Sequence, residues 1–458
     1  MTGRYQAYPE YKNSEVDWIG KYPSSWNITR VKFESYVKAR VGWHGLKSDD
    51  FTDEGPYLVT GSDFRGSNIK WEDCYHCDLE RYDQDPYIQL QEGDLLITKD
   101  GTIGKVALVN NLLGRATLNS GVFVVRPLGQ NYTSRFYFWL LQSSVFTGFV
   151  DFNKTGSTIV HLYQDTFVNF KYAMPAYSEQ LVINNFLDHE TAKIDTLIEK
   201  QQQLIQLLKE KRQAVISHAV TKGLNPDVPM RDSGVEWLGE VPEHWDVARL
   251  KHLLTNIKAG PFGSSLTKDM YVKSGYRVYG QEQVIPDDFN LGDYYISEEK
   301  YQELKQYQIA TDDILISCVG TFGKIAIVPP DIELGVINPR LIRLRCATSV
   351  TPSYLVTLLR SMVVFEQFSL LSRGGTMDVI NIGTLNEIIL PVPEISEQDV
   401  ILQFVYNETT KLDILINKAS SAIELMQERR TALISAAVTG KIDVRNWQPP
   451  QTNTTEAS

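Results

Sequence analysis

Residues 178–221 read SEQLVINNFLDHETAKIDTLIEKQQQLIQLLKEKRQAVISHAVT, and residues 396–439 read SEQDVILQFVYNETTKLDILINKASSAIELMQERRTALISAAVT. The two stretches are identical at 23 of 44 positions, and neither contains proline or glycine. In both, a serine that suits a helix N-cap is followed by a glutamate in the first turn. Each stretch is therefore predicted to form one long α-helix, about 65 Å in length at ~1.5 Å per residue.

Apolar residues recur along both predicted helices at the heptad-like spacing that is typical of a coiled coil. This predicted stripe consists of Leu187, Ile194, Leu197, Leu204, Leu208, Val215, Val405, Leu412, Leu415, Ala422, Met426 and Leu433. One globular head would leave much of so long a stripe uncovered, so we expect the two helices to pair. The alternative is two separate amphipathic helices, each packed on its own head. An antiparallel pair would place the heads at opposite ends of a rod with a pseudo-twofold axis.

The two helices belong to an internal repeat with a period near 219 residues. Residues 13–32 (NSEVDWIGKYPSSWNITRVK) align with residues 232–251 (DSGVEWLGEVPEHWDVARLK). At the same offset, residues 94–109 (DLLITKDGTIGKVALV) align with residues 313–328 (DILISCVGTFGKIAIV). Two such units account for nearly all of the 458 residues, so the chain is a tandem pair of domains and not a solenoid.

A globular head precedes the long helix in each copy. Short β-branched runs separated by Gly, Asp and Asn predict strands at Leu95–Ile97, Val106–Val109 and Val122–Val125. Short helices are expected at Ser134–Gln142 and Pro352–Ser361. The predicted fold class is therefore α+β, with two heads built on mainly antiparallel sheet and two long helices that pair as an antiparallel coiled coil.

The repeat sets the expected domain boundaries. The segments are an N-terminal segment (1–24), a first head (25–176), a first long helix (177–222), a linker that repeats the N-terminal segment (223–243), a second head (244–394), a second long helix (395–441) and a flexible tail (442–458). The N-terminal segment is expected to pack near the C-terminal helix, which makes the chain nearly circular. The two heads differ most in glycine-rich stretches near residues 31–60 and 250–279, a pattern that suits two readers of different targets on one frame.

The composition is that of a globular protein, with 43% hydrophobic and 22% charged residues. No run of about 18 apolar residues occurs, so no membrane span is expected. Four cysteines in 458 residues cannot form a disulfide framework, which favours the cytoplasm. The net charge of −11 argues against a protein that holds nucleic acid by bulk charge alone.

The ordered set of motifs, which occurs twice, resembles the specificity subunit of type I restriction-modification enzymes. The set comprises the E-Q helix start, D-(I/L)-L-I, G-T-x-G-K and a helix end of the form E-x-R-x-A-(V/L)-I-S-x-A-V-T, and it covers about residues 13–443. The resemblance implies two target-recognition domains that each read one half of a bipartite, asymmetric DNA site. It also implies a helical spacer on which two methyltransferase subunits dock.

The same resemblance assigns the chemistry to other subunits. The methyltransferase partners would bind S-adenosylmethionine, and a restriction subunit that uses ATP and Mg²⁺ would complete the nuclease. We therefore expect this chain to bind no cofactor and to be non-catalytic. It carries no N-P-P-F or D-P-P-Y adenine-methyltransferase motif and no G-x-S-x-G nucleophile elbow. The alternative function is a coiled-coil scaffold that binds protein partners alone, and a stand-alone DNA-modifying enzyme is disfavoured by the missing motifs.

Basic and hydroxyl side chains in and around the divergent loops are the candidate DNA contacts, because Arg and Lys bind guanine edges or phosphates and Ser can bind either. The set is Lys38, Arg40, His44, Lys47, Arg65, Lys105, Lys154, Lys258, Ser264, Ser265, Lys268, Lys324 and Arg373. Each of these, taken alone, is more often an ordinary solvated residue. Trp43 and Phe262 are further candidates for packing on a base or sugar, with core packing as the alternative.

Two short motifs have simpler interpretations than a ligand site. Gly101–Lys105 and Gly320–Lys324 lack the spacing and the hydroxyl of a Walker loop, so a tight turn is expected, with a lysine-to-phosphate contact as the alternative. Cys74-Tyr75-His76-Cys77 supplies half of a structural zinc site, but zinc needs four ligands and the second copy reads DYYI at residues 293–296. No metal is therefore expected.

Overall fold

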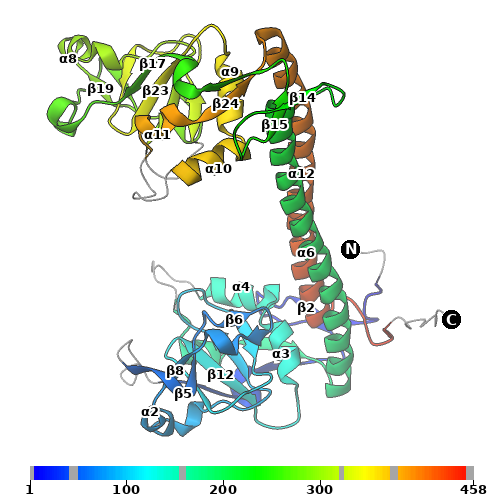
Figure 1. Ribbon diagram of the computed structural model, residues 1–458. Coiled ribbons are helices and arrows are strands. Elements are labelled where there is room, and N and C mark those ends of the chain that lie inside the picture. Colours follow the sequence, from blue (N-terminus) through cyan, green and yellow to red (C-terminus); the bar gives the residue numbers. More distant parts are fainter. Residues whose placement is uncertain (1–4, 41–49, 154–160, 319–323, 372–379, 450–458) are drawn as a thin grey trace. The chain divides into compact units, whose positions relative to one another are not determined.

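The computed structural model describes residues 5–40, 50–153, 161–318, 324–371 and 380–449 (Figure 1). The chain divides into two compact units, the first formed by residues 1–201 with 421–458 and the second by residues 202–420. Each unit therefore holds one head together with part of both long helices. Within the described residues, no helix has the length and apolar character that a membrane crossing requires.

The first unit is built on two small sheets. In the four-stranded antiparallel sheet the order is β10 (Val106–Leu108), β9 (Leu95–Thr98), β12 (Val122–Pro127), β4 (Ser35–Ala39). In the three-stranded sheet, β5 (Phe51–Val59) pairs in parallel with β11 (Ala116–Leu118) and antiparallel with β8 (Tyr75–Cys77). Two-stranded antiparallel ladders join β1 (Tyr11–Asn13) to β2 (Lys21–Pro23), β3 (Asn27–Arg30) to β13 (Lys171–Met174), and β6 (Phe64–Arg65) to β7 (Asn68–Ile69).

The second unit repeats this plan. Its antiparallel sheet has the order β17 (Leu254–Ala259), β23 (Leu341–Cys346), β20 (Ile314–Ser317), β21 (Ile325–Ile327). In its second sheet, β18 (Tyr276–Tyr279) pairs in parallel with β22 (Gly335–Ile337) and antiparallel with β19 (Tyr295–Ile296). The remaining ladders join β14 (Met230–Asp232) to β15 (Glu240–Pro242) and β16 (Asp246–Arg249) to β24 (Ile389–Val392). The prediction of an α+β fold on mainly antiparallel sheet is confirmed.

Short helices pack beside the sheets of each head. In the first unit they are α1 (Val31–Glu34), α2 (Leu79–Asp83), α3 (Ser134–Leu140), α4 (Ser144–Phe152) and α5 (Gln164–Phe167). In the second they are α7 (Gln281–Val284), α8 (Glu298–Glu303), α9 (Pro352–Leu359), α10 (Met362–Leu371) and α11 (Ile382–Glu387). The expected strands at β9, β10 and β12 and the expected helices at α3 and α9 are confirmed.

The two long helices are α6 (Tyr177–Lys222) and α12 (Ile395–Val438). In the first unit, Asp195 of α6 pairs with Arg430 of α12 at 2.8 Å. In the second unit, Arg212 of α6 pairs with Asp413 of α12 at 3.0 Å. The two ion pairs are the same pair at an offset of 218 residues, and the partner number on α12 falls as the number on α6 rises. The segments of α6 and α12 run in opposite directions in each unit, as Figure 1 shows.

The buried row of each long helix follows an alternating spacing of three and four residues, as in a coiled coil. We call this row the seam. On α6 it comprises Leu187, Thr191, Ile194, Ile198, Gln201, Ile205, Leu208, Arg212, Val215 and Ala219, and on α12 it comprises Val405, Thr409, Leu412, Ile416, Ala419, Ile423, Met426, Arg430, Leu433 and Ala437. All of these side chains are buried or half-buried.

The sequence-based stripe is wrong for Leu197, Leu204 and Leu415, which are 51%, 43% and 48% exposed. Each of these leucines is followed by an isoleucine, and that isoleucine occupies the seam. Ala422 likewise lies one residue before the seam residue Ile423 and is half-buried. The heptad spacing of the predicted stripe agrees with the seam, but its register differs from the seam by one residue at the Leu-Ile doublets.

The E-Q motif at the start of each long helix anchors the helix to its head. The side chains of Gln180 and Gln398 are fully buried. Gln180 accepts the N–H of Thr133 at 3.1 Å and donates to the carbonyls of Asn131 and Pro175 at 2.9 and 3.0 Å. Gln398 makes the equivalent three bonds in the second unit, to Thr351, Ser349 and Pro393. One amide thus ties the helix start to the N-cap of α3 or α9.

The glutamate before each of these glutamines explains the second tryptophan of the repeated segments 13–32 and 232–251. The indole N–H of Trp26 donates to Glu179 at 3.1 Å, and that of Trp245 donates to Glu397 at 3.0 Å. Both indoles are about 1% exposed. A buried indole needs a hydrogen-bond partner, and the helix supplies it through its first turn. The segment before each head is therefore bound to the helix that follows that head.

The N-terminal segment packs beside the end of α12 within the first unit. The backbone N–H of Asp443 donates to the carbonyl of Gln6 at 2.7 Å, and Tyr11 donates to the carbonyl of Gly440 at 2.8 Å. Val444 is 2% exposed, and Trp447 lies edge-on to Phe186 with 5.6 Å between ring centroids. The predicted flexible tail therefore starts too early, because residues 442–447 belong to the packed unit.

Candidate nucleic-acid interface

One end of the four-stranded sheet in the first unit gathers loops from several parts of the chain. The register places Thr98 of β9 opposite Val122 of β12, and Phe123 opposite Ala39 of β4. The loop before β12 joins through a bond from Lys99 N–H to the carbonyl of Gly121, 2.9 Å long. We define the loop edge of the first unit as residues 60–62, 99–105, 119–121 and 161.

The G-T-I-G-K motif forms a β-hairpin turn between β9 and β10. The hydroxyl of Thr98 accepts the N–H of Lys105 at 3.0 Å and donates to the carbonyl of Thr102 at 2.5 Å. Gly101 and Gly104 have φ angles of +66° and +83°, which glycine adopts without steric cost. The tight-turn interpretation is confirmed for the first copy, and the turn leaves Lys105 exposed.

A cavity of about 310 Å³ opens at this loop edge. Its lining residues are Thr60, Gly61, Ser62, Thr98, Asp100, Thr102, Lys105 and Gly121. Asp100 is held by a hydrogen bond from the Nδ1 side of His161, and the segment of His161 is fixed by a bond from Leu162 N–H to the carbonyl of Lys99 at 2.9 Å. The cavity therefore presents a carboxylate and a lysine on supported backbone.

The second unit forms the equivalent edge with different side chains. We define its loop edge as residues 260–265, 280–281, 317–318, 324 and 338–340. The carbonyl of Lys324 accepts the N–H of Ser317 at 3.0 Å, and in the first hairpin the carbonyl of Lys105 accepts the N–H of Thr98 at 2.9 Å. Gln281 donates to the Ser317 hydroxyl at 2.6 Å, and Arg340 stands where the first unit has Gly121. The framework of the edge is shared, whereas its chemistry is not.

Gly260 explains the close passage of one loop across the second edge. A Cβ at this position would lie 1.9 Å from the carbonyl oxygen of Asn338, so only glycine fits. Two residues after it, Phe262 is 73% exposed, and the turn Gly263–Ser265 carries both predicted serines. Ser264 is exposed and Ser265 is half-buried. An exposed aromatic ring, two hydroxyls and the exposed Arg340 thus lie on one edge.

The prediction that Arg40 is a DNA contact is wrong. Its side chain is 1% exposed, and it donates to the carbonyl of Leu118 at 2.8 Å and to the hydroxyl of Thr117 at 3.1 Å. Burial lowers the pKa of the Arg40 guanidinium. Arg40 therefore braces β4 against β11 and does not present its charge at the surface.

The other described candidates lie at the surface with differing degrees of engagement. Lys38 on β4 and Lys268 are exposed. Arg65 pairs with Asp73 at 3.1 Å and donates to the carbonyl of Ser62 at 2.6 Å, which places it beside the first loop edge. Lys258 is half-buried, with its ammonium 5.3 Å from the ring centroid of Tyr307. The structure thus brings Lys105, Ser264, Ser265 and Lys324 onto the two loop edges. His44, Lys47, Lys154 and Arg373 lie outside the described residues, as does Trp43.

The cysteine motif is part of the packing of the first head. Cys74 is buried with its thiol 3.6 Å from the carbonyl of Lys70, and burial raises the pKa of Cys74 to about 12. Cys77 is fully buried, and His76 contacts the carbonyl of Gly55 at 2.8 Å. Over the described part of the chain, no three His, Cys, Asp or Glu side chains are grouped so that they could hold a metal ion.

The structure adds edge residues that sequence reasoning missed. These are Thr60, Ser62, Asp100, His161, Gln281 and Arg340. The sequence could have indicated Asp100 and Arg340 as edge residues. Asp100 directly precedes the G-T-I-G-K turn, and Arg340 lies two residues after Asn338, which aligns with Asn119. His161 had none, because it reaches the edge from about 60 residues away in sequence.

Comparison with known proteins agrees with this architecture. The family model described as "Type I restriction modification DNA specificity domain" matches twice, over residues 45–207 and 242–425. The specificity subunit of the Escherichia coli type I restriction enzyme EcoBI is 23% identical over 367 residues, which is 78% of this chain and 74% of the relative. The MjaVIII specificity subunit of Methanocaldococcus jannaschii is 22% identical over 457 residues, 96% of this chain and 98% of the relative.

Solved structures share the fold at low sequence identity. A chain described in work on complex assembly and conformational transition of the type I R-M system superposes with a TM-score of 0.68 at 15% identity, covering 91% of this chain and 98% of its own. The HsdS subunit of Thermoanaerobacter tengcongensis gives a TM-score of 0.50 at 15% identity, covering 92% and 98%. With the family model matched to both repeats, the chain belongs to the type I restriction-modification family as a DNA specificity subunit.

Proposed function

We propose that each unit reads one half of a bipartite, asymmetric DNA site through its loop edge. This proposal rests on one observation: the two loop edges share the same backbone framework but differ in their side chains. Both edges use the same hairpin bonds, but Gly121 and Ser62 of the first unit are replaced by Arg340 and Gln281 in the second. Two different edges on one frame suit two different half-sites, because base identity is read by side chains in the grooves.

The chain acts as the recognition subunit of a larger complex and leaves the chemistry to its partners. Two methyltransferase subunits bring S-adenosylmethionine, and restriction subunits bring ATP and Mg²⁺. The net charge of −11 supports this division, since a chain that grips DNA by itself would gain from a basic surface. Its place is the cytoplasm, where its DNA target is accessible.

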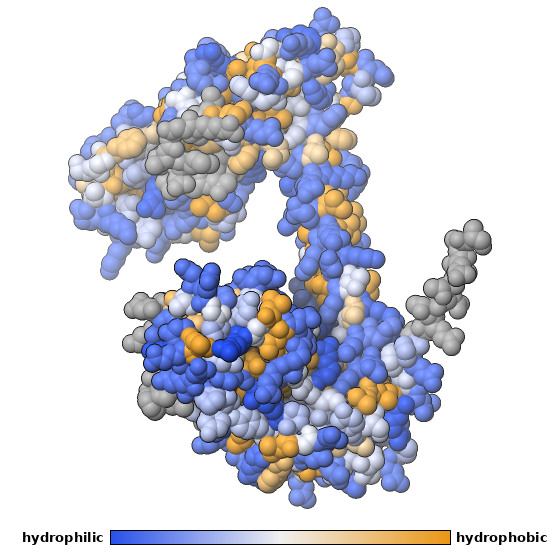
Figure 2. All heavy atoms as spheres, turned by 60° about the horizontal axis from the view of Figure 1, so that its bottom comes forward, coloured by the Kyte–Doolittle hydropathy of each residue, from blue (hydrophilic) through white to orange (hydrophobic). Residues whose placement is uncertain are grey.

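Exposed leucines along the long helices are the docking face for the methyltransferase subunits. In the second unit, Leu204 and Leu207 of α6 and Ile414 and Leu415 of α12 are 43–61% exposed. Apolar side chains appear among hydrophilic ones on the helix surface in Figure 2. Monomeric proteins rarely leave such rows uncovered, so a partner helix is the expected cover.

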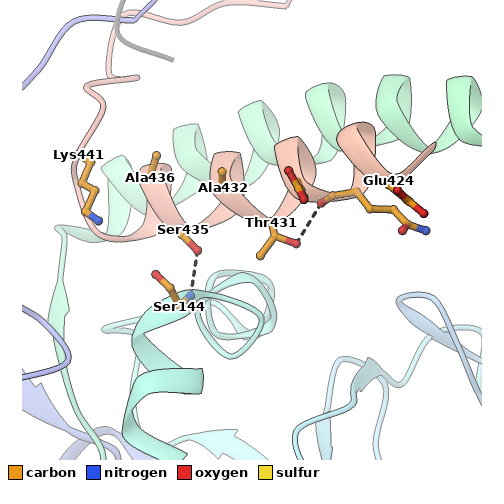
Figure 3. Close-up of a pocket in the computed structure, with 9 residues that line it drawn as sticks. Ser144, Glu424, Thr431, Ala432, Ser435, Ala436 and Lys441 are labelled. Carbon is orange, nitrogen blue, oxygen red and sulfur yellow. Dashed lines mark hydrogen bonds between the residues drawn. The ribbon is translucent and has the colours of Figure 1, made fainter. Parts of the chain in front are cut away.

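A groove in the first unit offers a further contact for the same partner. It has a volume of about 940 Å³ and lies between α12 and the start of α4, where Ser435 accepts the N–H of Ser144 at 2.9 Å (Figure 3). The lining residues include two carboxylates, Glu424 and Glu428, and one lysine, Lys441, so the charged side chains of the groove are acidic on balance. A groove of this shape and charge suits a basic segment of a docked subunit.

The long helices set the spacing between the two half-sites. The continuous helix α6 has 46 residues, about 69 Å at ~1.5 Å per residue. That length exceeds one turn of duplex, which rises ~3.4 Å per base pair. Two reading edges carried by such a helix can therefore address separated grooves.

Insertion of one heptad into each long helix tests the ruler directly. Duplicating residues 198–204 and 416–422 preserves the seam spacing and adds about 10.5 Å of helix. The methylated motif, read by methylome sequencing of cells that carry the methyltransferase partner, should keep both half-sites and gain a spacer about three base pairs longer. Insertion into one helix alone should abolish methylation, because the seam no longer matches. An unchanged spacer in the double insertion would refute the ruler role.

A further inference from the structure

The cavity at the first loop edge is lined by a carboxylate, Asp100, and an ammonium group, Lys105. Lys105 is exposed and makes no ion pair with any described residue. Asp100 lines the same cavity and is 44% exposed on its side chain. A carboxylate beside the lysine repels a phosphate, so the cavity is poorly suited to holding backbone alone. It offers one acceptor and one donor within a single cavity.

The local structure aims Asp100 into the cavity. His161 binds its Oδ1 atom from one side. A Cβ built on Gly121 would lie 3.9 Å from Oδ2, in ordinary van der Waals contact, so a larger side chain at residue 121 would cover that oxygen. Among the described residues, Oδ2 has no hydrogen-bond partner. The carboxylate is thus fixed through one oxygen and available through the other.

The sequence of the second unit has no carboxylate at the position of Asp100. At the position of Asp100 its sequence has Val319, and at the position of Gly121 it has Arg340. There, Gln281 is bound to the hydroxyl of Ser317. The pairing of a carboxylate with a lysine is therefore a feature of the first loop edge. It is suited to a base pair that differs between the two half-sites.

We propose that the Asp100–Lys105 cavity reads one C·G base pair in the half-site of the first unit, an inference that rests on the DNA-reading function proposed above. In the major groove, cytosine presents its N4 amino group as a donor, and the paired guanine presents O6 and N7 as acceptors. Asp100 Oδ2 accepts from cytosine N4, and the Lys105 ammonium donates to the guanine. Adenine would favour Asn or Gln in place of the carboxylate.

Methylome sequencing of the full chain expressed with its methyltransferase partner tests this pairing. One half-site of the wild-type motif should contain a required C·G pair. Asp100→Asn and Gly121→Leu should relax that position by about tenfold or more and leave the other half-site unchanged. Gly121→Leu fills the cavity without altering charge, since its Cβ meets nothing closer than 3.8 Å. The matched control Asp17→Asn removes one carboxylate from the exposed N-terminal segment and should leave the motif intact.

The outcomes separate this inference from the function on which it rests. A bipartite motif that both cavity variants leave unchanged, or a motif whose half-sites contain no C·G pair, overturns the cavity assignment alone. A wild-type complex that methylates no bipartite motif overturns the proposed function, and the assignment falls with it. Because the second half-site is read in the same experiment, its retention shows that each variant complex has assembled.

Discussion

Replacing Gln180 with alanine is expected to destabilise the first unit by about 3 kcal/mol or more. The substitution leaves the N–H of Thr133 and two carbonyls without the partner that the buried amide supplies. Each buried polar group that loses its partner costs about 1–3 kcal/mol. The loss falls at the junction of helix and head, so α3 and the first turns of α6 should open together.

Hydrogen exchange followed by mass spectrometry can resolve this effect unit by unit in the full chain. In Gln180→Ala, exchange should rise in peptides of Ser134–Leu140 and stay unchanged in Pro352–Leu359, and Gln398→Ala should show the reverse. Gln202→Ala is the matched control, because Gln202 is exposed on the same helix. Equal exchange in the Gln180 and Gln202 variants would show that the amide does not anchor the helix.

Placing aspartate at Leu204 and Leu415 together is expected to abolish assembly with the methyltransferase subunit while the chain remains folded. Both side chains are exposed beside the seam, so the substitutions remove no core packing. At a docking interface, burying two charges without partners should weaken binding by roughly a hundredfold or more, since apolar anchor residues contribute about 2 kcal/mol or more each.

Native mass spectrometry of the co-expressed subunits measures this loss as stoichiometry. The control exchanges two leucines of the first head, Leu113 and Leu128, for aspartate; they are 66% and 62% exposed. That control should assemble as the wild type does, and both variants should unfold at the wild-type temperature. Full assembly of the Leu204/Leu415 variant would place the docking face elsewhere on the chain.

The sequence could predict the elements that repeat. Gly101 and Gly104 predict a turn because glycine adopts left-handed backbone without steric cost, and both residues have positive φ angles. Lys105 follows this turn and is exposed. The E-Q pair could be recognised as a helix start, but its purpose could not. Gln180 reaches the N-cap of a helix almost 50 residues earlier, a contact that no local pattern encodes.

The register of the seam could not be predicted from hydrophobic periodicity alone. Leu197 and Ile198 are adjacent and equally apolar, so both satisfy a heptad pattern within one residue. The tertiary packing decides between them, because Ile198 packs against the core cluster that contains Leu433, whereas Leu197 is 51% exposed. The prediction that Arg40 contacts DNA was wrong for a related reason. A basic residue before a glycine-rich loop resembles a surface contact until the strand beside it is known to bury it.

The central claim is that each head reads its own half of the DNA site. Replacing residues 30–175 with the corresponding head of another family member, and sequencing the methylome of cells that carry the chimaera and the methyltransferase subunit, tests this most directly. The predicted result is a motif in which one half-site is new, and the other half-site is that of the parent chain. A motif changed in both halves would contradict the account, because the second head would then not read its half-site independently.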